Sequence, residues 1–156
     1  MSGLARAKFD AALAECGIHA RVLAEAAGEL PTAFSADDVG AIDVKQRRLL
    51  DQAAYRFMKL QDSLGEKVLP GILELTLDPL PPEASFAEKL QRLERLGAIS
   101  SAGTWRLLRE VRNSLAHEYP ENPALQAAGL TRLVRGLAEL LGLWSEVERF
   151  ATGRLP

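Results

Sequence analysis

Apolar residues recur along most of the chain at intervals of three and four positions, which is the spacing of one face of an α-helix. The clearest case is residues 4–30, where the apolar positions form a heptad seam. The seam consists of Phe9, Leu13, Cys16, Ala20, Leu23, Ala27 and Leu30. Cys16 lies on the seam and is interpreted as a small buried thiol. His19 lies off the seam and is interpreted as a surface histidine.

A second helix is predicted over about residues 36–64, because residues 35–38 (Ser-Ala-Asp-Asp) have the spacing of a capping box. Its buried side carries Ile42, Leu49, Ala53, Phe57, Leu60 and Leu64. Helical spacing of apolar residues continues past Gly65, and Pro70 is expected to kink this helix or begin a new turn. Residues 77–82 contain three prolines within four positions, so they are predicted to form an extended connector.

Three further helices are predicted after this connector. A capping box at residues 85–88 begins a short helix with Leu90, Leu93 and Leu96 inward, and Gly97 ends it. Ser100 or Ser101 caps the next helix. The last helix begins at Asn122 and Pro123 and ends at Gly153. The apolar side of the last helix consists of Leu130, Leu133, Leu137, Leu140, Leu141, Trp144 and Val147.

Four long helical stretches and one short one predict an all-α fold, an up-and-down four-helix bundle with an additional short helix. The length of 156 residues suits a single domain spanning residues 1–156. Composition agrees, because 47% of the residues are hydrophobic but only 6% are aromatic, a balance that favours helix over strand. The connector at residues 77–82 is not interpreted as a domain boundary, since neither half alone would form a convincing bundle.

The net charge of -2 argues against a protein that coats nucleic acid by charge alone, so any RNA contact must be local, in a cleft lined with arginines. The single cysteine cannot form an internal disulfide, which suits a reducing cytosol. We find no N-terminal signal region and no run of ~18 apolar residues that could span a bilayer. The sequence therefore predicts a soluble, cytoplasmic protein without a membrane partner.

Polar residues of several kinds gather within residues 105–120, which are predicted to form a helix that closes at Pro120. Its apolar arc contains Leu107, Leu108, Val111 and Leu115, with Trp105 at the edge. Its polar side contains Arg106, Arg109, Asn113 and His117. A histidine held only for packing should lie within the apolar arc, and His117 does not.

Asn113 and His117 are four residues apart and share a face of this helix. Arg112 and His117, five residues apart, diverge by about 140° on an ideal helix. One straight helix therefore cannot direct both side chains at one small ligand. Either the last turn unwinds before Pro120, or a second copy of the helix supplies the missing group, and we favour both.

Residues 112–119 (Arg-Asn-Ser-Leu-Ala-His-Glu-Tyr) resemble the R-x4-H-x-Y signature of HEPN domains, in particular HepT-type toxins of bacterial toxin–antitoxin pairs. The resemblance implies a helical bundle that forms a homodimer, with two motifs in one cleft, and metal-independent cleavage of RNA. It also implies a small nucleotidyltransferase antitoxin as partner. That antitoxin would silence the toxin by attaching AMP to the motif tyrosine, here Tyr119.

The chemistry of RNA cleavage matches these residue types. His117 can serve as general base or general acid near neutral pH, and Arg112 can hold phosphate oxygens through two parallel hydrogen bonds. These two are the predicted catalytic residues. Asn113 would orient His117 or bind the scissile phosphate, while Tyr119 and Arg109 would contact the substrate. We expect no cofactor and no metal, since two histidines and one cysteine without an H-E-x-x-H motif make a poor zinc site.

Two function classes remain open at this stage. The first is a ribonuclease toxin that uses Arg112 and His117 in a dimer cleft. The second is a non-catalytic substrate-binding or partner subunit of a nucleotidyltransferase, which keeps the fold and the dimer but does not cleave RNA. Tyr55, Asp62 and Glu66 would join the cleft if the second helix lies against the motif helix; otherwise they are ordinary surface or boundary positions.

Overall fold

The structure is a computed structural model, and it describes residues 2–115 and 121–156. These residues form helices joined by turns and loops, and no β-strand occurs among them. The prediction of an all-helical chain is therefore confirmed for the described part. In chain order the elements are α1 (Ser2–Gly28), α2 (Ala36–Gly40), α3 (Val44–Ser63), the π-helical segment η1 (Leu64–Val68), α4 (Leu69–Glu74), α5 (Phe86–Leu96), α6 (Ala102–Ser114) and α7 (Pro123–Gly153).

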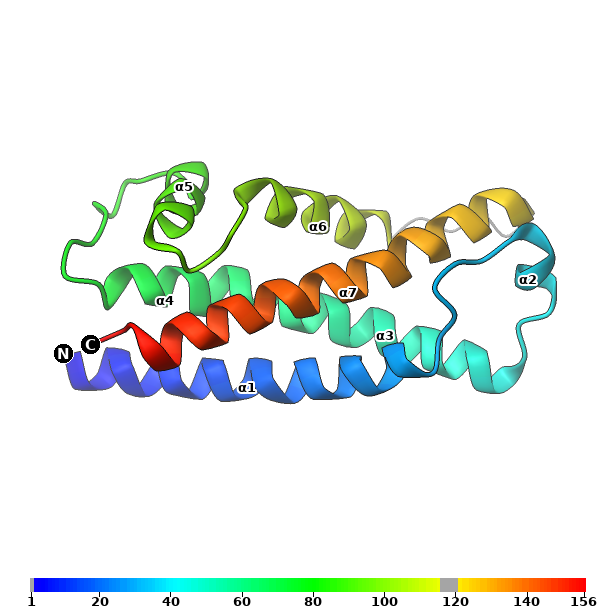
Figure 1. The fold of residues 1–156 in the computed structure, drawn as a ribbon, viewed down its shortest axis with the longest axis horizontal. Helices are drawn as coiled ribbons and strands as arrows, with labels where there is room; N and C mark the ends of the chain where they lie inside the picture. Colours follow the sequence, from blue (N-terminus) through cyan, green and yellow to red (C-terminus); the bar gives the residue numbers. More distant parts are fainter. Residues whose placement is uncertain (1, 116–120) are drawn as a thin grey trace.

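The long helices lie side by side along the long axis of the molecule (Figure 1). α1 packs along α3, and α7 contacts both of them. α6 packs against α7 and α3, whereas α5 lies against α4 and α6. The two ends of the chain lie close together, and the Arg6 guanidinium donates a hydrogen bond of 2.8 Å to the carbonyl oxygen of Pro156. Helices α5 and α6 thus share one face of the molecule.

One apolar core runs between these helices. The side chains that are both large and fully buried are Phe57, Leu23, Leu60, Leu64, Leu69, Ile72, Leu93, Ile99, Leu108, Leu137, Leu140 and Gln61. The predicted seam of α1 faces this core, with Cys16 and Leu23 fully buried and Phe9 only 3% exposed. Burial raises the pKa of the Cys16 thiol to about 12, because the thiolate would lose its hydration. The interpretation of Cys16 as a buried thiol is confirmed.

The second predicted helix is interrupted near its start. The capping box is present: the Ser35 hydroxyl accepts from the backbone N–H of Asp38, and the Asp38 carboxylate accepts from that of Ser35. The helix that it begins nevertheless ends at Gly40. Asp43 then caps α3, accepting a hydrogen bond from a backbone N–H three residues later. The prediction of one continuous helix was wrong here, because glycine is a poor helix former and the aspartate offers a second start.

The chain stays helical past Gly65 and into the turn that contains Pro70, as the apolar spacing predicts. The change of register falls before the proline, in the π-helical segment η1. At Gly65 an added Cβ would lie 2.9 Å from the Trp105 ring, so glycine allows the ring of α6 to pack directly on this segment. π-Helical turns are frequent at functional sites, which directs attention to the side chains around η1.

The predicted helix boundaries after the connector are largely confirmed. Residues 77–82 form no helix. The Ser85 hydroxyl accepts from a backbone N–H at the start of α5, and Gly97 ends that helix with a left-handed φ of 84°. The side-chain oxygen of Asn122 caps α7, which begins at Pro123.

The motif helix is described as far as its last residue, Ser114. α6 is capped by Ser101, one of the two predicted residues, and extends to Ser114, while the predicted close at Pro120 lies outside the described residues. The Ser114 hydroxyl donates a 2.7 Å hydrogen bond to the carbonyl oxygen of Val111. Such local hydrogen bonds compete with continued helix, which explains an end at this serine.

The buried face of α6 is rotated from the predicted one. Leu107, predicted within the apolar arc, is 57% exposed, whereas Trp105, predicted at its edge, is only 3% exposed. The reason is that α6 packs against α3, α5 and α7, so the bulkier indole occupies the contact with α5 and η1. Leu108 and Val111 are buried as predicted.

Replacing two glycines by alanine should change the free energy of unfolding in opposite directions. At Gly71 of α4 an added Cβ would lie 2.7 Å from Cδ2 of Phe9, a buried ring, so Gly71→Ala should lower the free energy of unfolding by about 1–3 kcal/mol. At Gly142, exposed within α7, an added Cβ would meet no atom within 4 Å apart from its chain neighbours and the adjacent helix backbone, so Gly142→Ala should raise the free energy of unfolding by about 0.5–1 kcal/mol through helix propensity. Urea denaturation followed by circular dichroism measures both, and changes of the same sign would contradict the α1–α4 packing.

Candidate functional site

The predicted site residues divide between described and undescribed parts of the chain. His117 and Tyr119 lie outside the described residues. Arg109, Arg112 and Asn113 lie on the last turns of α6, where Arg109 and Asn113 are exposed and Arg112 is partly buried. The end of α6 therefore carries three polar side chains directly before the second half of the motif.

Arg112 is held by Asp62 of α3. Its Nε donates to Oδ1 of Asp62 over 2.9 Å, and its Nη2 donates to Oδ2 over 3.1 Å. Both side chains are about one third exposed, at 32% for Arg112 and 31% for Asp62. Two parallel hydrogen bonds fix the plane of the guanidinium as well as its position, which a single contact would not do.

The pair leaves part of the guanidinium accessible. Nη1 of Arg112 makes no hydrogen bond to any described residue. The hydrogen bonds that Arg112 donates to Asp62 raise the pKa of Arg112, so this group stays charged throughout the physiological range. The arrangement can therefore bind an anion through its remaining N–H groups while Asp62 holds the other edge. The carboxylate also compensates the positive charge, which weakens attraction to a distant phosphate.

Asp62 was predicted as a cleft residue only if the second helix lies against the motif helix. α3 does contact α6, so the condition is fulfilled and Asp62 lies beside Arg112. Tyr55, predicted under the same condition, is 49% exposed and lies beside Arg56 and Lys59. No local signal in the sequence shows that Asp62, and not Asp51, the other carboxylate of α3, pairs with Arg112, because that partner is 50 residues away.

A cavity of about 480 Å³ adjoins this pair, between α3, η1, α5 and α6. Its lining residues are Gln61, Asp62, Gly65, Glu66, Phe86, Ala87, Leu90, Trp105, Arg106 and Arg109. Asp62 thus belongs to the cavity and to the Arg112 pair at once. Glu66, the third conditional cleft residue, lines the cavity as well. Sequence reasoning did not assign Gln61, Phe86 or Trp105 to a site. Gln61 reads as an ordinary polar position, and Trp105 reads as the edge of an apolar arc.

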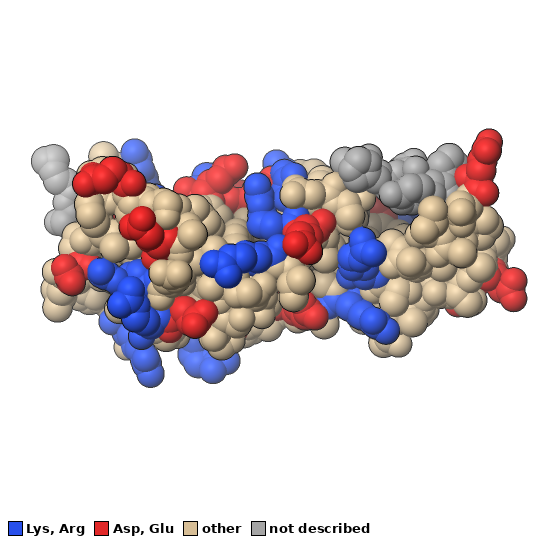
Figure 2. All heavy atoms as spheres, turned by 90° about the horizontal axis from the view of Figure 1, so that it is seen from above, with Lys and Arg blue, Asp and Glu red and all other residues tan. Residues whose placement is uncertain are grey.

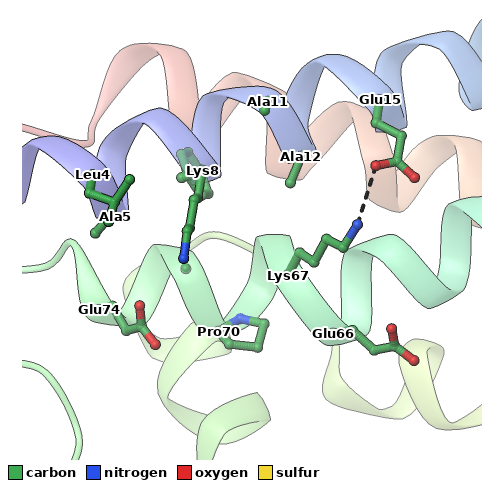
Figure 3. A pocket seen from close by; sticks show the side chains of 12 residues that line it. Leu4, Ala5, Lys8, Ala11, Ala12, Glu15, Glu66, Lys67, Pro70 and Glu74 are labelled. Carbon is green, nitrogen blue, oxygen red and sulfur yellow. Dashed lines mark hydrogen bonds and ion pairs between the residues drawn. The ribbon is translucent and has the colours of Figure 1, made fainter.

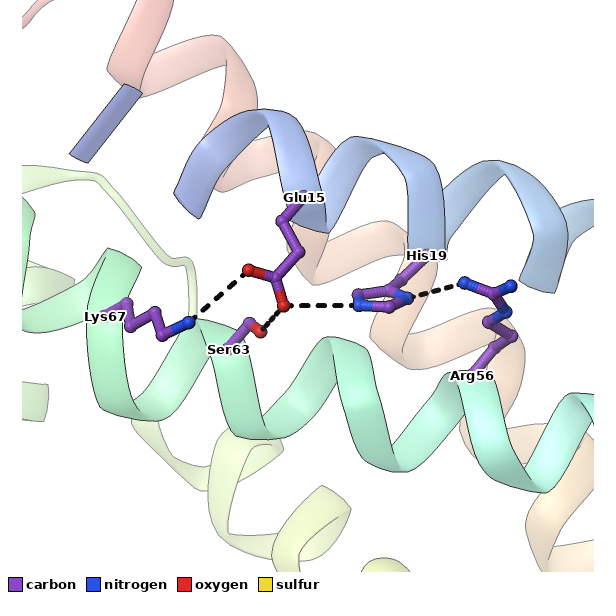
Figure 4. A network of polar contacts seen from close by, with 5 residues as sticks. All are labelled: Glu15, His19, Arg56, Ser63 and Lys67. Atoms are coloured by element: carbon purple, nitrogen blue, oxygen red, sulfur yellow. Dashed lines mark hydrogen bonds and ion pairs between the residues drawn. The ribbon is translucent and has the colours of Figure 1, made fainter. Parts of the chain in front are cut away.

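His19 is not a surface histidine, and that interpretation was wrong. The residue is 8% exposed, and its ring lies between α1 and α3 (Figure 4). The Arg56 guanidinium can only donate, so Nδ1 of His19 accepts its hydrogen bond of 2.9 Å. Nε2 then carries the proton and faces Oε1 of Glu15 at 3.5 Å. Burial of His19 could not be predicted locally, because His19 lies beside the apolar seam and Arg56 is on another helix.

Glu15 connects this histidine to η1. Its carboxylate accepts from the Ser63 hydroxyl over 2.9 Å and from Lys67 Nζ over 3.4 Å (Figure 4). The hydrogen bond from Ser63, assisted by Lys67, holds the pKa of Glu15 below its usual value. The network joins α1 to α3 and η1 and therefore fixes the register of the helices that present Asp62.

A larger hollow lies elsewhere, between the beginning of α1 and the η1–α4 segment (Figure 3). It measures about 620 Å³ and is lined by alkyl groups together with Lys8, Lys67 and three carboxylates. The carboxylates are Glu15, Glu66 and Glu74. Lysines and carboxylates interspersed in this way favour no particular charge of ligand, and this hollow holds none of the motif residues.

Basic and acidic side chains are interspersed on the face that carries α5 and α6 (Figure 2). Among residues 2–115 and 121–156, no group of three or more His, Cys, Asp or Glu side chains is placed to hold a metal ion. Nor is any helix in those ranges long and apolar enough to cross a membrane. Because the face as a whole carries both signs of charge, positive charge at the site comes only from individual arginines of α6 within the described part.

Comparison of the chain with protein-family models, with curated proteins and with solved structures finds no significant match. The resemblance to HEPN domains accordingly depends on residues 112–119 alone and stays a prediction.

Proposed function

We propose that this chain is a metal-independent endoribonuclease of the HEPN type, the toxin of a bacterial toxin–antitoxin pair in the cytoplasm. Support comes from the R-x4-H-x-Y spacing of residues 112–119. The observation that carries the proposal is the paired, partly exposed guanidinium of Arg112. It is a preorganised phosphate-binding group on the same short segment as His117, the one residue in the motif that can transfer protons near neutral pH.

In the proposed reaction the RNA supplies its own nucleophile, the 2′-hydroxyl. A base removes the hydroxyl proton, O2′ attacks phosphorus, and the bond from phosphorus to the 5′-oxygen breaks. The 5′-oxygen takes a proton from an acid, leaving a 2′,3′-cyclic phosphate and a 5′-hydroxyl. Arg112 stabilises the charge that develops on the phosphate oxygens, an effect of about 3–4 kcal/mol for one donor. His117 serves in proton transfer, and Asn113 or Arg109 binds the flanking phosphate.

The proposal includes a homodimer built on an up-and-down four-helix bundle with an additional short helix. Successive long segments running in opposite directions along the molecule support that topology (Figure 1). In a two-fold dimer the two copies of His117 can divide the roles of base and acid. A dimer also explains how Arg112 and His117 could act on one phosphate although they diverge on a single helix, because each copy would supply one of the two groups.

The partner in the proposal is a nucleotidyltransferase that acts as the antitoxin and attaches AMP to Tyr119. A bulky, negatively charged group beside Arg112 would compete with the substrate phosphate for the guanidinium and would block the cleft. The modification would therefore silence the toxin without unfolding it.

One observation favours the second candidate function, a non-catalytic substrate-binding or partner subunit of a nucleotidyltransferase. Asp62 compensates the charge of Arg112 at short distance. If Asp62 keeps that guanidinium engaged permanently, the pair is part of the helix packing rather than a catalytic group, and RNA is not cleaved.

Expression of wild type and of His117→Ala in a bacterial host separates the two. We expect wild type to arrest growth and to accelerate RNA decay, and the variant to do neither, since proton transfer contributes about 10²–10⁴-fold to such reactions. The purified proteins should behave likewise with RNA in the presence of EDTA.

Expression levels and melting temperatures of the two proteins must match, so that loss of activity is not loss of fold. Equal growth and equal RNA decay for wild type and variant would overturn the ribonuclease proposal in favour of the non-catalytic subunit.

A further inference from the structure

The cavity between α3, η1, α5 and α6 is lined in part by a buried polar side chain that has no hydrogen-bond partner among the described residues. Gln61 is fully buried, and neither its amide oxygen nor its amide nitrogen makes a hydrogen bond within the described part of the chain. A buried, unpaired amide lowers stability, and a protein usually keeps one for a purpose other than packing. Gln61 belongs to the lining of this cavity, although its amide atoms are covered in the unliganded protein. A turn of this side chain toward the cavity would let a ligand there supply the missing partner.

An aromatic side chain borders the same cavity. Phe86, at the first turn of α5, is 39% exposed although it is a large apolar residue. Its ring centroid lies 6.2 Å from that of the buried Trp105, so the two rings are in aromatic contact. Trp105 in turn packs directly against Gly65, where any side chain would collide with its ring. The exposed ring is thus a supported surface on which a planar group can stack.

Charged groups of both signs complete the lining. Glu66, exposed on η1, makes no ion pair with any residue in the described ranges. Arg106 and Arg109 approach the cavity from α6, and both are exposed. The lining therefore offers two hydrogen-bond acceptors in one plane, from a carboxylate, together with guanidinium donors.

From these features we propose that the cavity binds a guanine base of the RNA substrate, unstacked from its neighbours. Guanine presents two adjacent donors, N1–H and the N2 amino group, to the Glu66 carboxylate. Its O6 and N7 are acceptors for an arginine of α6. The base stacks on Phe86, as unpaired RNA bases commonly do on aromatic side chains. The proposal deepens the ribonuclease function proposed above and depends on it.

The other bases fit this lining less well. Adenine, cytosine and uracil each place a ring nitrogen or carbonyl acceptor beside their donor on the same edge, which would face the negative carboxylate. Only guanine gives a carboxylate two hydrogen bonds without a repelling acceptor between them.

The cavity and the phosphate site are joined by one residue. Asp62 lines the cavity and also holds Arg112, while Arg109 lies one helical turn before Arg112. A nucleotide whose base enters the cavity therefore has its phosphate near the guanidinium of Arg112. The enzyme would cut beside guanine, and its sequence preference would arise from α3, η1 and α5 rather than from the motif.

Guanosine 5′-monophosphate tests the cavity apart from catalysis, because it contains no bond that the proposed reaction breaks. Isothermal titration of the full-length protein should show binding tighter than that of the adenosine and uridine monophosphates by about ten-fold or more. Inosine 5′-monophosphate, which lacks the N2 amino group, should fall between them.

Three variants locate the site. Glu66→Gln and Phe86→Ala should each weaken binding of guanosine 5′-monophosphate by about ten-fold. Gln61→Leu should weaken it too while raising the melting temperature of the unliganded protein, a pair of effects that a purely structural glutamine would not give. Glu74→Gln and Leu107→Ala, at exposed positions outside this cavity, are the matched controls and should bind as wild type does.

RNA cleavage completes the test. Wild type should cut a single-stranded oligonucleotide beside its only guanine, and replacing that guanine by adenine should slow cleavage by about ten-fold or more. Specific binding without any cleavage would support the guanine site and overturn the ribonuclease proposal. Cleavage with no preference for guanine, and no binding of the monophosphate, would overturn the guanine site and leave the ribonuclease proposal standing.

Discussion

Replacing Arg112 by lysine should lower the rate of RNA cleavage by about a hundred-fold or more, although the positive charge is kept. The guanidinium makes two parallel hydrogen bonds to Asp62 and still has donors for a phosphate, whereas an ammonium is a point charge that cannot keep both contacts in a fixed plane. Single-turnover cleavage of a fluorescent oligonucleotide at saturating enzyme measures this effect apart from substrate binding.

Arg135→Lys, at an exposed position of α7, is the control for the same substitution and should leave the rate unchanged. The Asp62→Asn variant then tests whether the carboxylate positions Arg112 for catalysis or only restrains it. If Asp62 positions Arg112, the rate falls, because a neutral amide can accept only one of the two hydrogen bonds. Faster cleavage in Asp62→Asn would mean that the carboxylate only restrains a guanidinium that acts better without it. An unchanged rate in Arg112→Lys would remove Arg112 from the catalytic residues.

Local signals in the sequence predicted most of the secondary structure. Capping residues act over three or four positions, so Ser35, Asn122 and the left-handed Gly97 could be read directly from their neighbours. The seam of α1 could be read in the same way, because a long amphipathic helix has only one face that can be buried. The break before Asp43 was missed because Ser35 and Asp43, eight residues apart, are both adequate helix caps, and the folded chain uses both.

Features that depend on neighbouring helices could not be predicted. His19 is buried because Glu15 and Arg56 satisfy both ring nitrogens, and Arg56 is 37 residues away. Leu107 and Trp105 exchange the expected degrees of burial because α6 has neighbours on more than one side. A helical wheel divides one helix into two faces, but it contains no information on how many helices surround it.

The candidate site divides in the same way. The motif spacing identified Arg112 from eight consecutive residues. Its partner Asp62 was named only under a condition on helix packing, which the structure meets. Gln61 looked like an ordinary polar position in α3, and only the tertiary structure places it in the core, without a hydrogen-bond partner in residues 2–115 and 121–156. Residues that carry a motif can be found from sequence, whereas residues that position them are found from contacts.

Phe57 contributes to the stability of the fold and also packs between the helices that carry the proposed site. This ring is fully buried in α3, and the space over Gly136 of α7 is shared between Phe57 and Val111 of α6. Val111 directly precedes Arg112, and Asp62 follows Phe57 on α3 by a little more than one turn. The ring thus lies where α3, α6 and α7 meet. The spacing of α3 and α6 in turn sets the distance between Asp62 and Arg112.

Phe57→Ala should therefore lower the free energy of unfolding by about 3–5 kcal/mol, because it removes a fully buried ring and leaves a cavity where three helices meet. Phe86→Ala makes the same chemical change on a ring that is 39% exposed and should cost less than about 1 kcal/mol, since exposed positions tolerate substitution. Urea denaturation of both proteins compares the two costs. The order reverses for ligand binding, where only Phe86→Ala should weaken guanosine 5′-monophosphate under conditions that keep both variants folded. If the exposed ring proved the costlier one for stability, Phe86 would be a core residue and the cavity beside it would have no stacking surface.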